Sequence, residues 1–318
     1  MLMSETLTHP DEGAAFISDQ DAALRRWTHD TPGPIKIGSD EHRKMFCRML
    51  LDTHDPYRPA VLDWPGLEPD ALSRLTSLPI WDIAVQTEGR ASIRVLTYAQ
   101  TLSDPLLREA IEMDAAEEAR HKVVLSNLVQ AYGIELAPEP AYLPPQKAEW
   151  AWMFTGYSEC IDSFFAFGLF RSAQRSGFFP PDLVETFEPV IQEEARHILF
   201  FVNWVAWYRK TMPWWRRPWH AVRVAAIWFM LVWERLAIAR GIDASGNTRD
   251  SNFLPANREV LGDALEPREM IELCLAENDA RMSGYDARLL RPTLVPTLAR
   301  FALRLLKKSR HNVKRARC

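Results

Sequence analysis

The pentapeptide EEARH occurs twice in this chain of 318 residues, at positions 117–121 and 193–197. In each copy the second glutamate stands three residues before the histidine, so the two side chains share one face of a helix. Carboxylate and imidazole groups placed together in this way can bind a divalent metal ion. The alternative is a pair of solvent-exposed helix faces with contacts between acid and base. The repeat therefore predicts either two metal half-sites or two polar surfaces.

The residues around each copy favour the metal half-sites. On a helix, the face that carries the first glutamate–histidine pair also carries Ile111 and Leu128, and the equivalent face of the second copy carries Val190 and Phe201. Such apolar faces belong in a protein core. Burying a carboxylate there costs several kcal/mol unless it is paired or bound to a metal. We therefore expect both glutamate–histidine pairs to point into the core and to bind metal.

A single glutamate precedes each copy at a similar interval, Glu88 before the first and Glu159 before the second. Each lies on an apolar helix face, so four carboxylates and two imidazoles are expected to converge between packed helices. A ligand set dominated by carboxylates suits iron or manganese better than zinc. The predicted ligands are Glu88, Glu118 and His121 in one half-site, and Glu159, Glu194 and His197 in the other.

The elements that must position these ligands are helices. The helical period dominates from about residue 80, and no useful stretch alternates between apolar and polar residues as a strand does, so we predict an all-α protein. Ser103 is the expected N-cap of the second long helix, and Pro189 is expected to kink the fourth. The predicted helices are 40–52, 79–102, 105–132, 146–176 and 181–210, with two or three more in 213–318. The predicted division is 1–78 for an N-terminal arm and short helix, 79–210 for a four-helix metal-binding bundle, and 211–318 for Trp-rich and basic helices packed on it.

The doubled pattern of a glutamate followed by ExxH resembles the ferritin-like di-iron carboxylate superfamily. The resemblance covers residues 80–210 and implies a ferritin-like four-helix bundle with additional N- and C-terminal helices. It also implies that the six predicted ligands hold two iron ions, with manganese or a mixed iron–manganese pair as alternatives.

The remaining residues of the pentapeptide are predicted to support the ligands. Glu117 and Glu193 are the expected acceptors for the outer N–H of the metal-bound imidazoles, each serving the histidine of the opposite half-site. Ion pairs Glu117–Arg120 and Glu193–Arg196 are expected within each helix. This arrangement resembles the hydroxylase subunits of bacterial multicomponent monooxygenases, in which the first position is usually aspartate rather than glutamate.

Other polar residues on the same helices are further candidates. Asp114 and Asp162 could each be an extra ligand, although an ion pair with an arginine is the favoured role for both. Ser163 matches a hydroxyl position found near the oxygen site of some monooxygenases, and could equally bond its own helix backbone. Leu125 occupies the position of the tyrosine in ribonucleotide reductase small subunits, which argues against a stable tyrosyl radical.

Composition excludes several other classes. The net charge of −4 argues against general nucleic-acid binding. The four cysteines form no CxxC motif, which fits a reducing cytoplasm and excludes a cysteine-rich zinc or rubredoxin-type module. The N-terminal sequence lacks the features of a signal peptide, and no uncharged apolar run is long enough to span a bilayer.

The segment 204–240 is rich in tryptophan, and ten Lys or Arg residues follow Asp286, the last acid in the chain. Tryptophan beside arginine, with a basic amphipathic C-terminus, is typical of segments that lie on an anionic membrane surface. The alternative is a Trp-rich core helix followed by a solvated tail. We expect a cytoplasmic protein. The sequence does not decide whether 204–240 and the basic C-terminus also make a peripheral contact with the inner face of the membrane.

The expected function is that of an O2-dependent di-iron oxidase or oxygenase that hydroxylates or otherwise oxidises a small or lipophilic organic substrate. An external reductase or ferredoxin must supply electrons, because no flavin, nicotinamide or Fe–S motif is visible. One alternative is an iron-handling or peroxide-reducing protein like ferritin or rubrerythrin. Another is a metal-free helical scaffold that binds a membrane or a partner protein. With each of these functions the chain could form a homodimer. The aromatic residues available to line a substrate pocket are Trp152, Phe164, Phe165, Phe167 and Phe201.

Overall fold

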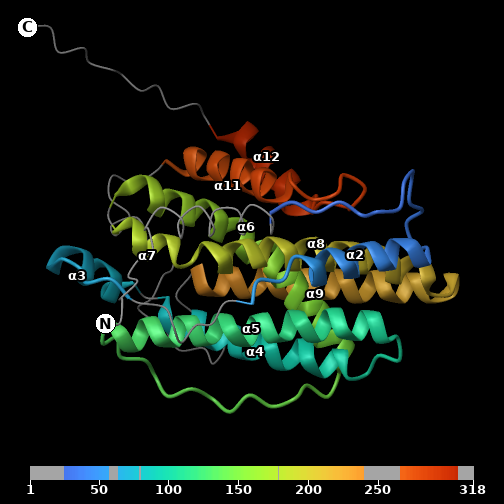
Figure 1. The fold of residues 1–318 in the computed structure, drawn as a ribbon, viewed down its shortest axis with the longest axis horizontal. Helices are drawn as coiled ribbons and strands as arrows, with labels where there is room; N and C mark the ends of the chain where they lie inside the picture. The colour runs from blue at the N-terminus through green and yellow to red at the C-terminus, as the bar shows by residue number, and fades with distance from the viewer. Residues whose placement is uncertain (1–24, 57–63, 79, 178, 240–265, 307–318) are drawn as a thin grey trace, which may run out of the picture.

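A computed structural model of the chain describes residues 25–56, 64–78, 80–177, 179–239 and 266–306 (Figure 1). Within those ranges the regular elements are helices, and the only pairing of strand type is an isolated bridge between Trp27 and Tyr285. The all-α prediction is confirmed. The basic run 307–318 lies outside the described residues.

The predicted helices occur close to their expected positions. They are α2 (Asp40–Asp52), α4 (Trp81–Ala99), α5 (Pro105–Ala131), α6 (Ala148–Ser176) and α8 (Glu188–Thr211). The other described helices are α3 (Pro69–Ser77), α7 (Pro181–Glu185), the 3-10 turn η2 (Trp214–Arg216), α9 (Arg217–Ala239), α11 (Pro267–Met282) and α12 (Leu294–Leu305).

The N-cap of α5 is Asp104 and not Ser103, so that prediction was wrong. The Asp104 carboxylate accepts a hydrogen bond of 2.9 Å from the backbone N–H of Leu107, and Pro105 occupies the first turn. Proline is tolerated there because its nitrogen has no hydrogen to donate, which moves the cap to the residue directly before it. The helix that carries the first EEARH copy is therefore fixed at its start by a side chain.

The predicted helix 181–210 is interrupted rather than kinked. It divides into α7 and α8 around Thr186 and Phe187, and Pro189 lies in the first turn of α8. A proline inside a helix removes a backbone hydrogen bond and clashes with the preceding turn. Beginning a new helix just before Pro189 avoids both penalties, and it sets the start of the helix that carries the second EEARH copy.

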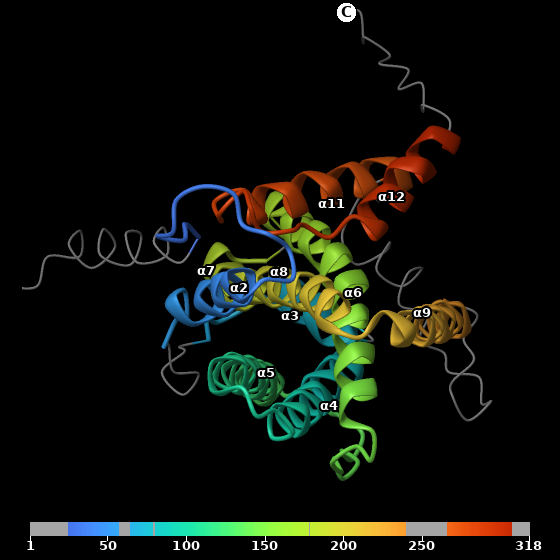
Figure 2. The same ribbon diagram turned by 90° about the vertical axis from the view of Figure 1, so that its right-hand side faces the viewer.

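The helices that carry the predicted ligands contact one another: α4 packs on α5 and α6, and α8 also contacts α5 and α6. The short helix α2 packs against both α5 and α8. In Figure 2, where α5 is seen almost end-on, α6 runs across the view, so these two helices are far from parallel. The connection 132–147 runs along the outside of α4 and α5 (Figure 1).

The main apolar core joins helices from the whole described chain. Phe46 of α2, Trp152 of α6 and Trp204 of α8 are almost completely buried in one cluster, together with Leu231 of α9 and Met282 of α11. Truncating a buried aromatic side chain typically costs about 3–5 kcal/mol. The helices before and after the bundle therefore contribute to the same core, and the division at residues 78 and 210 stays a prediction.

Close packing fixes α6 against its neighbours. A Cβ atom on Gly156 would lie 2.2 Å from the ring of Phe201 in α8, and one on Gly168 would lie 2.3 Å from Sγ of Cys274 in α11. Only glycine allows these approaches without displacement of the neighbouring side chain. Among the described helices, none has the length and apolar character needed to cross a membrane.

Candidate metal centre

Three helices bring one group of predicted ligands together. Glu88 comes from α4, Glu118 and His121 come from α5, and Glu194 comes from α8. One ligand atom from each of the four residues lies within 4.8 Å of the others. This separation is short enough for a single metal ion to bind them with small side-chain adjustments. The first group therefore combines residues from both EEARH copies.

A second group lies beside the first and shares a residue with it. Asp114 and Glu118 of α5 and His197 of α8 also place ligand atoms within 4.8 Å of one another. The rings of His121 and His197 have centroids 5.7 Å apart. Because Glu118 belongs to both groups, its two carboxylate oxygens could bridge two metal ions.

The grouping differs from the predicted half-sites. Glu194 lies with His121 rather than with His197, and Asp114 takes the place beside His197 that was assigned to Glu159. Glu159 belongs to neither group, although it lies near enough for the charge of Asp114 to act on it. Burial first, and then that charge, raises the pKa of Glu159 well above its usual value. A ligand role for Glu159 stays a prediction.

The cluster contains buried polar atoms that have no hydrogen-bond partner. Leaving one such atom unsatisfied costs about 1–3 kcal/mol. Some of these atoms lie close to a group of opposite type: Nδ1 of His197 is 2.9 Å from Oε1 of Glu118, and Nδ1 of His121 is 3.3 Å from Oε1 of Glu194. Metal ions in the two groups would satisfy the atoms of Asp114, Glu118, His121 and His197, and the donor types suit this role, while Glu159 lies outside both groups. The atoms are Asp114 Oδ1, Glu118 Oε1, His121 Nδ1, Glu159 Oε1 and His197 Nδ1.

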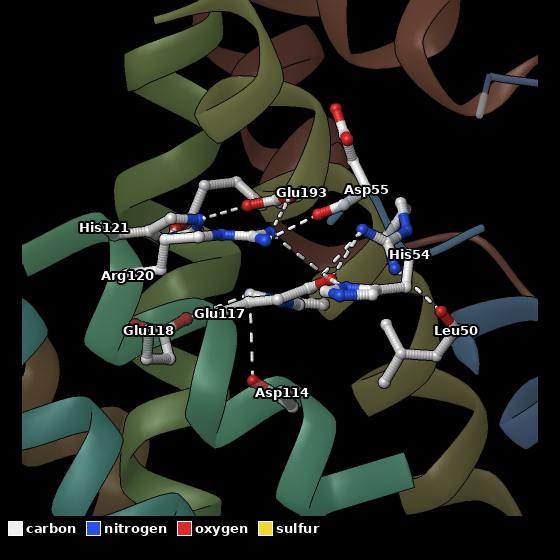
Figure 3. Close-up of polar contacts among 12 residues, drawn as sticks. Leu50, His54, Asp55, Asp114, Glu117, Glu118, Arg120, His121 and Glu193 are labelled. Carbon is white, nitrogen blue, oxygen red and sulfur yellow. Dashed lines mark hydrogen bonds and ion pairs between the residues drawn. The ribbon is translucent and has the colours of Figure 1, made fainter. Parts of the chain in front are cut away.

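Hydrogen bonds orient both imidazoles toward the acids, as Figure 3 shows for His121. The Nε2–H of His121 donates to Glu193 at 2.7 Å, and the Nε2–H of His197 donates to Glu117 at 2.7 Å. The predicted hydrogen bond from each histidine to the glutamate of the opposite copy is confirmed. Since a carboxylate can only accept, each Nε2 carries the proton and each Nδ1 can offer its lone pair to a metal.

The arginines bond across the two copies rather than within them. Nη1 of Arg196 donates to Glu117 at 3.2 Å, and Nη2 of Arg120 donates to Glu193. The same-helix contact predicted between Arg120 and Glu117 is longer, at 3.8 Å. Because both glutamates lie between α5 and α8, an arginine reaches the carboxylate of the facing helix more directly. The predicted ion pair between Glu117 and Arg120 is therefore present, but as the longer contact, and the shorter contacts of both arginines are with the facing helix.

The charge state of Glu117 follows from these contacts. Burial alone would raise its pKa, but the charge of Arg196 and the hydrogen bonds from His197 and His54 outweigh burial and hold the pKa well below its usual value. Glu117 is completely buried and nevertheless ionised. The arrangement therefore places a fixed negative charge behind the imidazole of His197.

The end of α2 supplies contacts that the sequence did not predict. The ring of His54 hydrogen-bonds Glu117 through Nδ1 at 2.6 Å, and the hydroxyl of Thr53 accepts from Nε of Arg196 at 2.8 Å. The carbonyl of Leu50 accepts from Nη2 of the same arginine at 2.7 Å. The only signal in the sequence is the run THD at residues 53–55, directly after the predicted helix 40–52. The end of α2 thus holds Glu117 and Arg196, the two residues behind His197, in place.

Asp55 provides the equivalent contact for the other arginine. Its backbone carbonyl accepts a hydrogen bond of 2.5 Å from Nη1 of Arg120 (Figure 3). Both arginines of the repeated pentapeptide are therefore bound to the segment that follows α2. Helix α2 packs against both α5 and α8, and this packing brings the segment that follows α2 to the site, although it is distant in the sequence.

Asp114 and Asp162 have different environments. Asp114 is buried, and its carboxylate lies 3.8 Å from Nδ1 of His197, so the favoured pairing with an arginine is replaced by a place in the second group. Burial above all raises the pKa of Asp114 to about 6. The Asp162 carboxylate lies 2.5 Å from Nη2 of Arg235, so its predicted pairing with an arginine is confirmed.

Ser163 contacts the cluster directly. Its hydroxyl donates to Glu194 at 2.8 Å. Of the two predicted roles, a hydroxyl near the site is therefore favoured over a hydrogen bond to the backbone of its own helix. The aromatic residues expected to line a pocket are mostly buried, but Phe165 is 41% exposed and faces outward. The buried members are Trp152, Phe164, Phe167 and Phe201.

Comparison of the chain with protein-family models, with curated proteins and with solved structures finds no match in any of the three. The arrangement of these side chains is therefore the basis for a functional assignment. In the described part of the chain, the Glu, Asp and His residues form two adjoining groups that could hold metal ions.

Proposed function

We propose that the chain is an O2-dependent di-iron oxidase or oxygenase that acts on an organic substrate, built on a ferritin-like bundle of α4, α5, α6 and α8. The observation that carries the proposal is the pair of adjoining acid–histidine groups with Glu118 common to both. Two ions that share a carboxylate are the arrangement expected of a di-metal site in a helix bundle. The unsatisfied ligand atoms in the core support the same reading.

The donor set supports iron or manganese over zinc because carboxylates outnumber imidazoles. One ion would be held by Glu88, Glu118, His121 and Glu194. The other would be held by Asp114, Glu118 and His197, with Glu159 as a further carboxylate close by. Two ferrous ions in this position would supply the binding and reduction of O2.

The chain's own residues would orient the ligands and exclude water. Glu193 and Glu117 hold the two imidazoles in one tautomer, and Arg120 and Arg196 hold those two glutamates in place. The hydroxyl of Ser163 fixes one oxygen of Glu194. Outer contacts of this kind typically change metal affinity or activity by about 10–100-fold when they are removed. An external reductase or ferredoxin would supply the electrons, and the organic substrate would bind from solution.

The test is isotopic. The iron-loaded protein is supplied with a chemical reductant, 18O2 and a panel of small aromatic and aliphatic substrates, and the products are analysed by mass spectrometry. Incorporation of one 18O atom into a product, lost in Glu118→Gln and kept in Asp162→Asn, is the expected result. Asp162→Asn is the matched control because Asp162 lies outside both groups and pairs with Arg235.

Three other outcomes would replace the proposal. Accumulation of many ferric ions per chain during aeration, without substrate oxidation, would identify an iron-storage protein. Catalytic consumption of hydrogen peroxide without any requirement for O2 would identify a peroxide-reducing protein. Absence of bound metal would leave a helical scaffold that binds a membrane or partner.

A further inference from the structure

The outward face of α9 is apolar where a surface helix is normally polar. Trp219, Phe229 and Trp233 are 72%, 70% and 61% exposed, and their positions fall on one side of the helix. Ile227 and Leu231 are fully buried on the opposite side, toward the core. The helix is therefore apolar on both faces. The other exposed apolar residues of the outward face are Val222, Met230 and Leu236.

Helix α12 carries a second exposed apolar stripe. Leu294, Leu298, Phe301 and Leu305 recur at intervals of four, three and four residues, which places all four on one face. Each is between 46% and 68% exposed. A stripe of this kind normally packs against something, because exposed contiguous apolar patches mark interaction sites.

The two helices lie on the same side of the molecule. In Figure 2 both α9 and α12 reach the right-hand edge of the described structure, beyond α6 and α11. Helix α9 packs on α6, and α12 packs mainly on α11. The helices that carry the two apolar stripes therefore lie at the same side of the described structure.

The sequence segments that carry the stripes contain more basic than acidic residues, although Glu234 of α9 is also exposed, and Arg223 and Arg300 pair with Glu149 and Asp279. No aspartate or glutamate occurs between Ala195 and Trp233, and that stretch includes Arg216, Arg217 and Arg223. No acid follows Asp286, while ten Lys or Arg residues do. Because the whole chain has a net charge of −4, its positive charge is concentrated in the segments that carry the exposed apolar residues. The guanidinium of Arg216 lies over the ring of Trp215, 4.9 Å from its centroid.

We propose that α9 and α12 form a docking surface for an anionic lipid bilayer. Tryptophan and aliphatic side chains would enter the boundary between headgroups and acyl chains, while the arginines contact lipid phosphates. A second copy of the chain is a poorer occupant. A symmetric dimer would bring the same positive segments of two copies together, and like charges across an interface are unfavourable.

The experiment is co-sedimentation of the full chain with vesicles of phosphatidylcholine alone, or with about a third phosphatidylserine. The expected result is binding to the anionic vesicles only, weakened when the salt concentration is raised. The triple variant Trp219→Ser/Phe229→Ser/Trp233→Ser should bind at least about 100-fold more weakly, since burying one such side chain contributes roughly tenfold. Arg300→Gln/Arg304→Gln should lose about fivefold for each charge removed.

Leu143→Ser is the matched control, because Leu143 is 79% exposed but lies on the connection between α5 and α6. It should bind vesicles as the wild type does. All the substituted residues are at the surface, so circular dichroism should show an unchanged helix content. No binding to anionic vesicles, or equal binding by the triple variant, would overturn the proposal. So would a stable dimer that the triple variant dissociates, because a second copy would then occupy the surface.

Discussion

Glu117→Gln is predicted to have a large effect on the stability of the metal-free protein. The side chain is completely buried and accepts hydrogen bonds from His197, His54 and Arg196 at 2.7, 2.6 and 3.2 Å. Glutamine keeps the shape but removes the charge, and its amide N–H would face a group that is itself a donor. Arg196 is only 1% exposed, so its charge would be left buried without a counter-charge.

Breaking a buried ion pair by removing one partner costs about 3–5 kcal/mol. We therefore expect the free energy of unfolding of chelator-treated Glu117→Gln to fall by that amount, measured by urea denaturation. At about 2 °C per kcal/mol for a large chain, the melting temperature should fall by roughly 6–10 °C. The affinity for ferrous iron should fall by about 10–100-fold because His197 loses its orienting acceptor.

The double variant Glu117→Gln/Arg196→Met separates the ion pair from other effects. Removing both charges avoids a lone buried cation, so the double variant should be less destabilised than the sum of the single variants by about 1–3 kcal/mol. A single-variant loss below about 1 kcal/mol, together with additive effects in the double variant, would refute the assignment of Glu117 as the buried counter-charge.

The pH dependence of stability provides a second readout for the same variant. The pKa of Glu117 is held well below its ordinary value of 4.5. A depressed pKa contributes stability that is present above the ordinary value and is lost as the pH falls through the folded-state value. The acid limb of the wild-type stability curve below about pH 4.5 should therefore be steeper than that of Glu117→Gln.

Three further predictions follow from the same contacts. Burial above all raises the pKa of Glu118 and Glu159, and the surrounding carboxylates raise the pKa of His121 and His197 against the effect of burial. Metal must displace protons held in this way, so a pH-stat titration at pH 7 should record at least about one proton released per metal ion, and no release would contradict this account. Ser163→Ala removes a hydrogen bond to an ionised carboxylate and should lower the free energy of unfolding of the metal-free protein by about 1.5–3 kcal/mol, whereas an unchanged value would show that the bond contributes nothing. Gly156→Ala places a Cβ against the ring of Phe201 and should destabilise by about 1–3 kcal/mol, and a more stable variant would show that the ring can move aside.

The helices were predictable because each carries its own signals. Apolar residues at helical spacing, Pro105 at the start of α5 and Gly177 after the end of α6 are local features that act within a few residues. The N-cap was predicted at Ser103 rather than at Asp104, and the residue types do not separate the two positions because both cap helices well. The same limit applies at Pro189, where a kink and a new helix have the same sequence signature.

The residues that could hold metal were largely predictable, but their grouping was not. The spacing of glutamate and histidine identified the face of each helix, while the partner of each face depends on how α5 and α8 pack together. That packing brings Glu194 to His121 and Asp114 to His197. His54 and Thr53 could not have been predicted, because they reach the site only through the tertiary position of α2.

The most direct test of the metal centre is anaerobic titration of the full chain with ferrous iron, followed by metal counting after removal of unbound ions. The account predicts two ferrous ions per chain, with binding of both weakened in Glu118→Gln because Glu118 belongs to both groups. Asp162→Asn should retain two ions. Failure of the wild-type chain to retain iron, or identical binding by Glu118→Gln, would contradict the central claim.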